Sequence, residues 1–362
     1  MHERVTRLRA LLRERDLPAL LVSAPSNRRY LSGFRGSAGM LLVSESAAML
    51  FTDGRYLIQS AREAPDFALS ELVNPGRSLG DALAEAAGML GLRRIGVEAS
   101  NLSLAEYRRI EAALDGVELV AGEGLVERLR EVKDGAEIAI LRRAIAITDQ
   151  AITAVLPQLR PEMSERQAAW MLEVAMRERG AEAPSFPIIV AAGPNAALPH
   201  ARPGDDLLGE GLPIVIDMGA RVDGYHADLT RTVTIGAPAA RFREIYAIVL
   251  AAQQQALAGL RPGLACSDAD ALARDHITAA GYGAAFGHGL GHGVGLDIHE
   301  GPGLRRVAEG KQSPVLHAGM VTSVEPGIYL EGWGGVRIED LALITADGAE
   351  QLSQAPKQVV TG

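Results

Sequence analysis

Two pairs of acidic residues each flank a turn between β-like runs, and this arrangement predicts two antiparallel hairpins. In the first pair, Asp217 follows the apolar run 213–216 and Asp228 precedes the run 229–235. A turn-like Val-Asp-Gly sequence at 222–224 separates the two runs, and positions 217 and 228 are equidistant from its first peptide bond. Residues equidistant from a hairpin turn face each other across the two strands, so we expect the two aspartates to be neighbours.

The second pair has the same layout. Glu325 and Glu339 end β-like runs on either side of the glycine-rich segment 331–335, and both are equidistant from Gly332. Two carboxylates held side by side repel unless a cation or a shared proton lies between them. Either pair alone is equally compatible with a solvated hairpin that carries surface acids, but two such pairs favour a divalent metal.

A histidine-rich and glycine-rich segment at 286–300 supplies a different type of donor. It contains His288, His292 and His299 together with five glycines. Glycine lets the backbone approach a ligand closely, and neutral imidazole is a common metal donor. A lone histidine in an apolar stretch is more often a hydrogen-bonded core residue, but three in this setting indicate a functional site.

At this point the chain resembles the dinuclear metallopeptidases of the methionine aminopeptidase, aminopeptidase P and prolidase group, whose catalytic fold is called pita-bread. The resemblance covers about residues 135 to 350, and it rests on segments 216–219, 226–232, 291–295, 299–300, 323–327 and 336–340. All five metal-ligand positions of the group hold the expected residue type, in order: Asp217, Asp228, His292, Glu325 and Glu339. Segments 27–34 and 50–56 resemble the amino-terminal domain of creatinase and of the proline-specific members, which methionine aminopeptidases lack.

The resemblance implies two divalent metal ions, bridged by Asp228 and Glu339, with Asp217 on one ion and with His292 and Glu325 on the other. An oxygen-rich donor set favours Mn²⁺, and Co²⁺ or Zn²⁺ are the alternatives. A water between the ions, with a lowered pKa, would attack the amide bond.

Further roles follow from the same resemblance. Glu325 would also shuttle the proton, and His299 and His200 would stabilise the oxyanion and contact the peptide. His288 would either line the specificity pocket or give structural support, and a loop histidine without function remains the alternative for His200.

The resemblance also implies cleavage of the Xaa-Pro bond, by a dipeptidase (prolidase) or by an aminopeptidase P that acts on longer peptides. A dipeptidase needs a cation for the free carboxylate of proline, typically an arginine. Several prolidases carry this arginine directly after the His-Glu-x-Pro motif, where this chain has Gly303, which leaves Arg305, Arg306 and Arg337 as candidates. Rival readings are a metal-free hydrolase similar to creatinase and an inactive binding module.

Composition and patterning predict two domains in the 362 residues. We expect an α/β domain at 1–125 and an α+β domain at 126–362, the latter with helices on one face of a curved, mostly antiparallel sheet and the active site on the other. The expected helices span about 4–15, 54–63, 79–90, 103–114, 136–156, 164–179, 240–259 and 267–280. The expected amino-terminal strands span 17–23, 39–43, 47–51, 94–98 and 117–120.

The remaining features narrow the class of protein. A net charge of −9 argues against a nucleic-acid partner. The single cysteine, Cys266, excludes an intrachain disulfide, and its expected role is that of a small buried residue. No membrane span, secretory signal or Gly-x-Ser-x-Gly motif is found, so the cytoplasm is the expected location. The resemblance also leads us to expect a homodimer.

Overall fold

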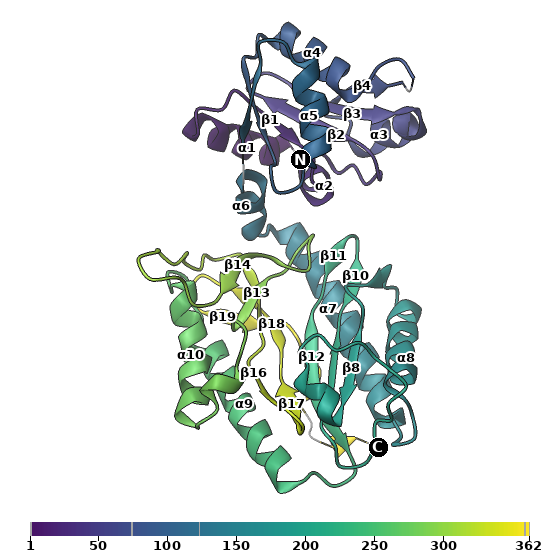
Figure 1. The fold of residues 1–362 in the computed structure, drawn as a ribbon, viewed down its shortest axis with the longest axis vertical. Coiled ribbons are helices and arrows are strands. Elements are labelled where there is room, and N and C mark those ends of the chain that lie inside the picture. Colours follow the sequence, from purple (N-terminus) through teal and green to yellow (C-terminus); the bar gives the residue numbers. More distant parts are fainter. Residues whose placement is uncertain (1, 74, 123, 358–359, 362) are drawn as a thin grey trace. The chain divides into compact units, whose positions relative to one another are not determined.

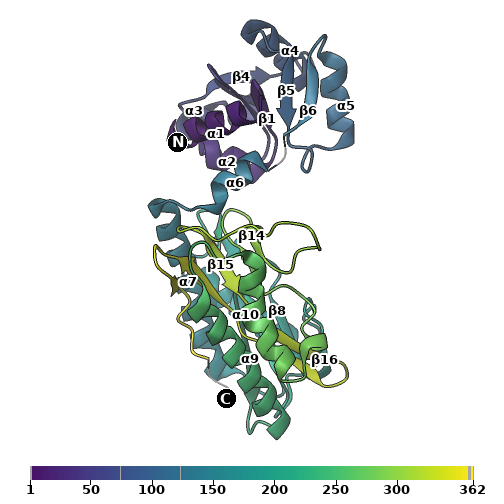
Figure 2. The same cartoon turned by 90° about the vertical axis from the view of Figure 1, so that its left-hand side faces the viewer.

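The computed structural model describes residues 2–73, 75–122, 124–357 and 360–361. The chain divides into two compact units, residues 1–130 and residues 131–362, which we describe one at a time. Figures 1 and 2 show the ribbon of each unit in two views.

The first unit is a six-stranded mixed sheet with helices around it, as expected for an α/β domain. Strands run in the order β4-β3-β2-β1-β5-β6, with antiparallel pairs in the β1-β2-β3 meander and parallel pairs elsewhere. The strands are β1 (Ala19–Val22), β2 (Met40–Ser44), β3 (Ala48–Asp53), β4 (Ala68–Leu72), β5 (Arg94–Val97) and β6 (Glu118–Ala121). The helices are α1 (His2–Glu14), α2 (Pro25–Ser32), α3 (Leu57–Glu63), α4 (Leu79–Leu90), α5 (Leu104–Ala113) and α6 (Leu125–Glu131).

The division between the units lies between Arg130 and Glu131, rather than near residue 125. The reason is helix α6, whose Leu125, Val126 and Leu129 are buried and whose Arg130 donates to the side chain of Asn27. The predicted boundary therefore falls at the start of a helix that packs into the first unit.

The second unit has two main sheets, each covered by a pair of helices (Figures 1 and 2). One sheet has the order β20-β12-β9-β8 and the other has the order β14-β13-β15-β18-β19. Their strands are β8 (Ile189–Ala192), β9 (Ile214–Met218), β12 (Leu229–Ile235), β20 (Val360–Thr361), β13 (Gly291–Gly293), β14 (Glu300–Leu304), β15 (Val321–Val324), β18 (Asp340–Ile344) and β19 (Ala349–Gln351). Smaller sheets contain β7 (Ala183–Pro184), β10 (Ala220–Val222) and β11 (Tyr225–His226), and β16 (Gly327–Leu330) and β17 (Gly334–Arg337).

Four long helices cover these sheets: α7 (Gly135–Val155), α8 (Glu165–Glu178), α9 (Ala240–Gly259) and α10 (Cys266–Ala279). Helix α7 begins where its sequence directs, because Asp134 and Glu137 form a reciprocal capping box. Helices α7 and α8 share a core with the first sheet, and α9 and α10 share a core with the second. The helices thus begin and end within a few residues of the sequence expectations.

Strand alternation separates the helix-covered face from the opposite face. In β8, Val190 and Ala192 belong to the core shared with α7 and α8, whereas Ile189 and Ala191 pack on the other side with Val215 of β9. Alternate side chains of a strand point to opposite faces. The face away from the helices is therefore free to form a cavity.

The two acidic hairpins differ in how well their register follows the prediction. In the second, Leu330 pairs with Gly334 around Gly332, as predicted. In the first, Val222 pairs with Tyr225, so the turn is Asp223-Gly224, and both turn residues have positive φ.

The first register prediction is therefore wrong by two residues: Asp217 faces Thr230 instead of Asp228. The physical reason is that Asp-Gly favours a two-residue turn with φ > 0 at both positions. A shift of two residues keeps both aspartates on the same face of the hairpin.

Within the described residues, the helices fall short of the length and apolar character that a membrane crossing requires.

Candidate active site

The five predicted metal ligands come together at the junction of the two main sheets. Asp217 lies in β9, Asp228 directly precedes β12, His292 lies in β13, Glu325 directly follows β15, and Glu339 lies between β17 and β18. All five line one cavity of about 780 Å³. A set of donor atoms from Asp228, His292 and Glu339 lies within 4.8 Å of one another, close enough to share an ion.

The second hairpin keeps one register through the site, because Val324 pairs with Asp340 and Gly327 pairs with Arg337 on either side of the two glutamates. Glu325 donates its backbone N–H to Leu290 O at 2.8 Å, and Glu339 donates to Thr230 O at 3.0 Å. The backbone N–H groups of the two glutamates thus point outward to neighbouring segments, and the flanking register places Glu325 opposite Glu339.

Two carboxylate oxygens of the site are buried and have no hydrogen-bond partner among the described residues, namely Asp217 Oδ1 and Glu339 Oε1. Burial, followed by repulsion from Glu339 and Asp217, raises the pKa of Asp228 well above its usual range. Burial and the charges of Glu325 and Asp217 do the same to the pKa of Glu339, and burial raises the pKa of Asp217. Buried, unpaired oxygens with raised pKa values are what a divalent cation would neutralise.

His292 pairs with two of the acidic ligands, Glu325 and Asp228, and its Nε2 lies 3.6 Å from Asp228 Oδ2. The His292 Nε2 to Glu325 Oε1 distance is 3.3 Å. Burial opposes charge on Glu325, but the contact with His292 outweighs it and lowers the pKa of Glu325 to about 2. The same contact outweighs burial at His292 and raises its pKa.

Arg337 is buried and occupied by protein partners. Its guanidinium donates to Asp217 Oδ2 at 2.8 Å, to Tyr329 Oη at 2.8 Å and to Thr230 Oγ1 at 3.0 Å. Tyr329 Oη in turn lies 2.9 Å from His288 Nε2. A role for Arg337 in binding substrate stays a prediction, and its contacts show that it holds Asp217 and Tyr329.

The remaining predicted histidines lie on the cavity wall. His299 is exposed and its ring meets that of His292 edge to face, with the centroids 4.4 Å apart. Burial and the neighbouring His292 lower the pKa of His299. His200 and His288 also line the cavity, so all three predicted histidines open onto the space in front of the ligands.

The candidate substrate-binding arginines differ in their position relative to the cavity. Arg305 lines the cavity, whereas Arg306 is exposed and is not one of the lining residues. Arg202 also lines the cavity, although no sequence motif marks it beyond its place two residues after His200.

Three further polar residues of the site escaped the sequence analysis, and two of them contact metal-ligand candidates. Thr230 Oγ1 donates to Glu339 Oε2 at 2.7 Å, and Ser323 Oγ donates to Glu325 Oε1 at 3.1 Å. Tyr329 links Arg337 to His288. Strand alternation could have placed Ser323 on the same face as Glu325, but no local signal identifies the partner of Thr230.

Comparisons with known proteins agree with this geometry. Residues 139–346 match the model of Metallopeptidase family M24, and residues 4–132 match that of the Creatinase/Prolidase N-terminal domain. The uncharacterized peptidase YqhT of Bacillus subtilis is 39% identical over 357 residues, covering 99% of this chain and 99% of its own.

Two solved structures have the same architecture over the whole chain. A Xaa-Pro dipeptidase from Bacillus anthracis has a TM-score of 0.95 and 39% identity, over 100% of this chain and 99% of its own. An X-Pro aminopeptidase from Thermotoga maritima has a TM-score of 0.89 and 37% identity, over 99% of this chain and 100% of its own. The chain is therefore a metallopeptidase that belongs to family M24, with a creatinase-type amino-terminal domain and a pita-bread catalytic domain.

Proposed function

We propose that this protein is a Xaa-Pro dipeptidase that uses two divalent metal ions, with Mn²⁺ as the preferred ion. The observation that carries the proposal is a pair of arginines on the wall of the cavity that holds the acidic ligands. Arg202 and Arg305 line the cavity, and within the described part of the chain neither side chain has a hydrogen bond or an ion pair. Two uncommitted guanidinium groups suit a substrate that ends in a free carboxylate.

The residues of the site fit the metal ions that the family implies. Four carboxylates and one imidazole form an oxygen-rich donor set that suits Mn²⁺. The buried oxygens of Asp217 and Glu339 that have no partner among the described residues are available to bind a cation. When bound, the ions would polarise the scissile carbonyl and make water nucleophilic near neutral pH.

The chain's own residues complete the chemistry. Glu325 lies on the cavity wall beside His292 and would accept the proton of the attacking water. It returns this proton to the proline nitrogen, which leaves as an amine. His200 and His299, on the cavity wall, donate to the oxygen that becomes negative in the transition state.

An aminopeptidase P that cleaves longer peptides is the second candidate. The cavity volume of about 780 Å³ favours it, because a cavity of this size accommodates ligands larger than a dipeptide. The name of the Thermotoga maritima structure points the same way. The homodimer expected from the family resemblance stays a prediction.

The test compares three substrates on the Mn²⁺-reconstituted full chain: a dipeptide Xaa-Pro, its C-terminal amide, and a longer Xaa-Pro-Xaa peptide. A dipeptidase should have a lower KM for the free acid than for the amide or the longer peptide. Replacing Arg202 or Arg305 by Gln should remove most of that preference, with a loss of about 1.5–3 kcal/mol for a charged hydrogen bond.

Arg306→Gln is the matched control, because Arg306 is exposed and does not line the cavity. Preference for the longer peptide would establish an aminopeptidase P. Activity that survives metal removal, or no activity at all, would support the rival readings of a metal-free hydrolase or a binding module.

A further inference from the structure

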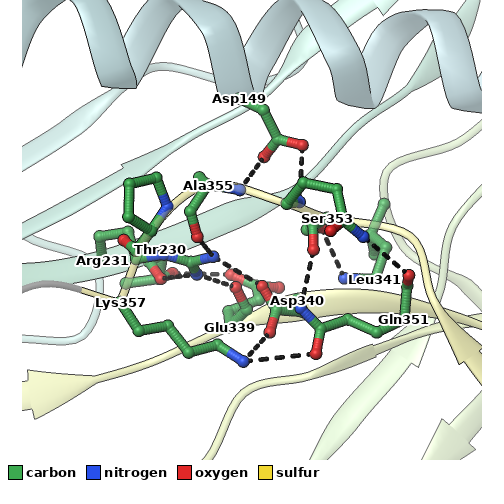
Figure 3. Close-up of polar contacts among 12 residues, drawn as sticks. Asp149, Thr230, Arg231, Glu339, Asp340, Leu341, Gln351, Ser353, Ala355 and Lys357 are labelled. Carbon is green, nitrogen blue, oxygen red and sulfur yellow. Dashed lines mark hydrogen bonds and ion pairs between the residues drawn. The ribbon is translucent and has the colours of Figure 1, made fainter.

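A buried ionic network lies behind the acidic site, on the side of the strands away from the cavity. Thr230 and Glu339 direct their side chains at each other beside the cavity. Because side chains alternate along an extended strand, the next residues, Arg231 and Asp340, point the opposite way. Their side chains are 1% and 0% exposed and lie 2.7 Å apart (Figure 3).

Arg231 bridges the two segments that carry metal ligands. Its Nη1 donates to Thr230 O at 3.0 Å and to Glu339 O at 2.6 Å. Asp228 lies two residues before Thr230 on the first segment, and Glu339 lies on the second. One guanidinium therefore links the backbones of both segments where no regular strand ladder joins them.

A carboxy-terminal segment, residues 351–357, which we call the strap, closes over this network. Its Ala355 O accepts a hydrogen bond from Arg231 Nη2 at 2.7 Å. The Nζ of Lys357 lies 2.6 Å from Asp340 Oδ2, and the Lys357 side chain is only 17% exposed. The strap thus contributes both a carbonyl and a cation to the network (Figure 3).

The strap is also fastened from its outer side. Asp149 of α7 accepts hydrogen bonds from the backbone N–H groups of Gln354 and Ala355, at 2.7 Å and 3.0 Å. On the inner side, Ser353 Oγ accepts from Leu341 N at 3.1 Å. The strap therefore has a defined position between α7 and the strand that begins directly after Glu339 (Figure 3).

We propose that the strap, through Lys357, Asp340 and Arg231, positions Glu339 relative to Asp228 and so sets the affinity of the site for divalent metal. These three are positioning residues, since they act through the backbones of the ligands. The inference rests on the metal centre proposed above. Groups that orient metal ligands commonly change metal affinity by 10- to 100-fold when they are replaced.

The test is a calorimetric titration of the metal-free full chain with Mn²⁺. The thermal midpoint of the metal-free chain and the kcat and KM of the Mn²⁺-loaded chain are measured alongside. Lys357→Met keeps the aliphatic stem and removes the charge. We expect Mn²⁺ to bind about tenfold more weakly or worse, with KM close to that of the wild type. The metal-free midpoint should fall, because the buried Asp340 loses one of its cations. Lys357→Arg should restore the affinity.

Arg142→Gln is the matched control, because it removes the exposed Arg142–Glu350 pair, which ties α7 to β19 without reaching Asp340. Wild-type affinity in Lys357→Met, or an equal loss in Arg142→Gln, would overturn the inference while leaving the proposed function intact. A wild-type chain that binds no Mn²⁺ would refute the metal centre itself.

A second variant carries the test if Lys357→Met does not fold. Asp149→Asn loosens the strap at α7 and removes none of the contacts that join Lys357, Asp340 and Arg231. Weaker Mn²⁺ binding in this variant supports the strap, and unchanged binding overturns it.

Discussion

At the scale of single residues, the hydroxyl group of Thr230 contacts two charged side chains at once. It donates to Glu339 Oε2 and accepts from Arg337 Nε. Arg337 in turn holds Asp217. Thr230 thus connects two ligands of the proposed metal centre that the hairpins place on different strands.

Thr230→Val should therefore cost both stability and metal binding. The change keeps the shape of the side chain but leaves a buried guanidinium nitrogen and a carboxylate oxygen without a partner. We expect the free energy of unfolding to fall by about 1–3 kcal/mol and the Mn²⁺ affinity to fall about tenfold, measured by denaturant titration and calorimetry.

Thr234→Val on the same strand is the control. Thr234 is equally buried, but its hydroxyl makes only one 3.5 Å contact, with Ile235 O. Equal effects of the two substitutions would show that any buried hydroxyl of β12 matters and that Thr230 has no special role.

At the scale of elements, β13 depends on a close approach of two backbones. A side-chain carbon at Gly291 would overlap the carbonyl oxygen of Ser323 on the neighbouring β15. Gly291 directly precedes His292, and His292 N donates to Ser323 Oγ at 2.9 Å. The glycine lets β13 bring the histidine into the site.

Gly291→Ala should push β13 away from β15 and displace His292. Overpacking of this kind costs about 1–3 kcal/mol, and a displacement of about 1 Å in a catalytic site can cost roughly 100-fold in rate. The measurements are the free energy of unfolding and kcat on the preferred substrate.

Gly287→Ala tests the same change a few residues upstream, where the new side chain would meet no atom within 4 Å. It should stay within about 0.5 kcal/mol of the wild type. A Gly291→Ala enzyme with wild-type kcat would contradict the assigned role of this close approach.

At the scale of the whole molecule, the acidic site links stability to pH. Asp217, Asp228 and Glu339 have raised pKa values in the folded chain. Between the usual carboxyl pKa of about 4 and these raised values, the folded state binds more protons than the unfolded state. The stability of the metal-free protein contributed by these groups is therefore lost as pH rises.

The raised pKa of His292 acts in the same direction at higher pH. Glu325 acts in the opposite direction. With its pKa lowered to about 2, its stabilising contribution is fully present above the usual carboxyl pKa and is lost only as the pH falls below about 4.

Added metal should consequently stabilise the protein more at pH 7.5 than at pH 5, because it replaces the protons that these ligands hold at low pH. A free Mn²⁺ concentration 100-fold above Kd stabilises by about 2.7 kcal/mol, and this gain should shrink towards pH 5. The measurement is the difference in thermal midpoint with and without Mn²⁺ at the two pH values. Because the same groups titrate with and without Mn²⁺, this difference removes the effect of groups remote from the site. An equal increase in thermal midpoint at both pH values would contradict the assignment of these residues as metal ligands.

Sequence reasoning reached furthest where the determining interactions are local. The helix α7 begins at a capping box of residues 134 and 137, and the second hairpin turns about Gly332 as its spacing predicts. The first hairpin shows that spacing alone is not sufficient. Equal spacing of the two aspartates from the turn predicted one register, but the preference of Asp223-Gly224 for a two-residue turn produced another. Turn type depends on the φ values that neighbouring residues tolerate.

The sequence by itself determined the types of the elements, the family and the chemical identity of the candidate ligands, since these depend on residue type and on near neighbours. Only the tertiary structure decided which charged groups are paired with other protein groups and which are available to a ligand. It pairs Thr230 with Glu339 across 109 positions, commits Arg337 to Asp217, and leaves Arg202 and Arg305 on the cavity wall. Such pairings arise when two sheets pack and exclude water, and no local pattern encodes them.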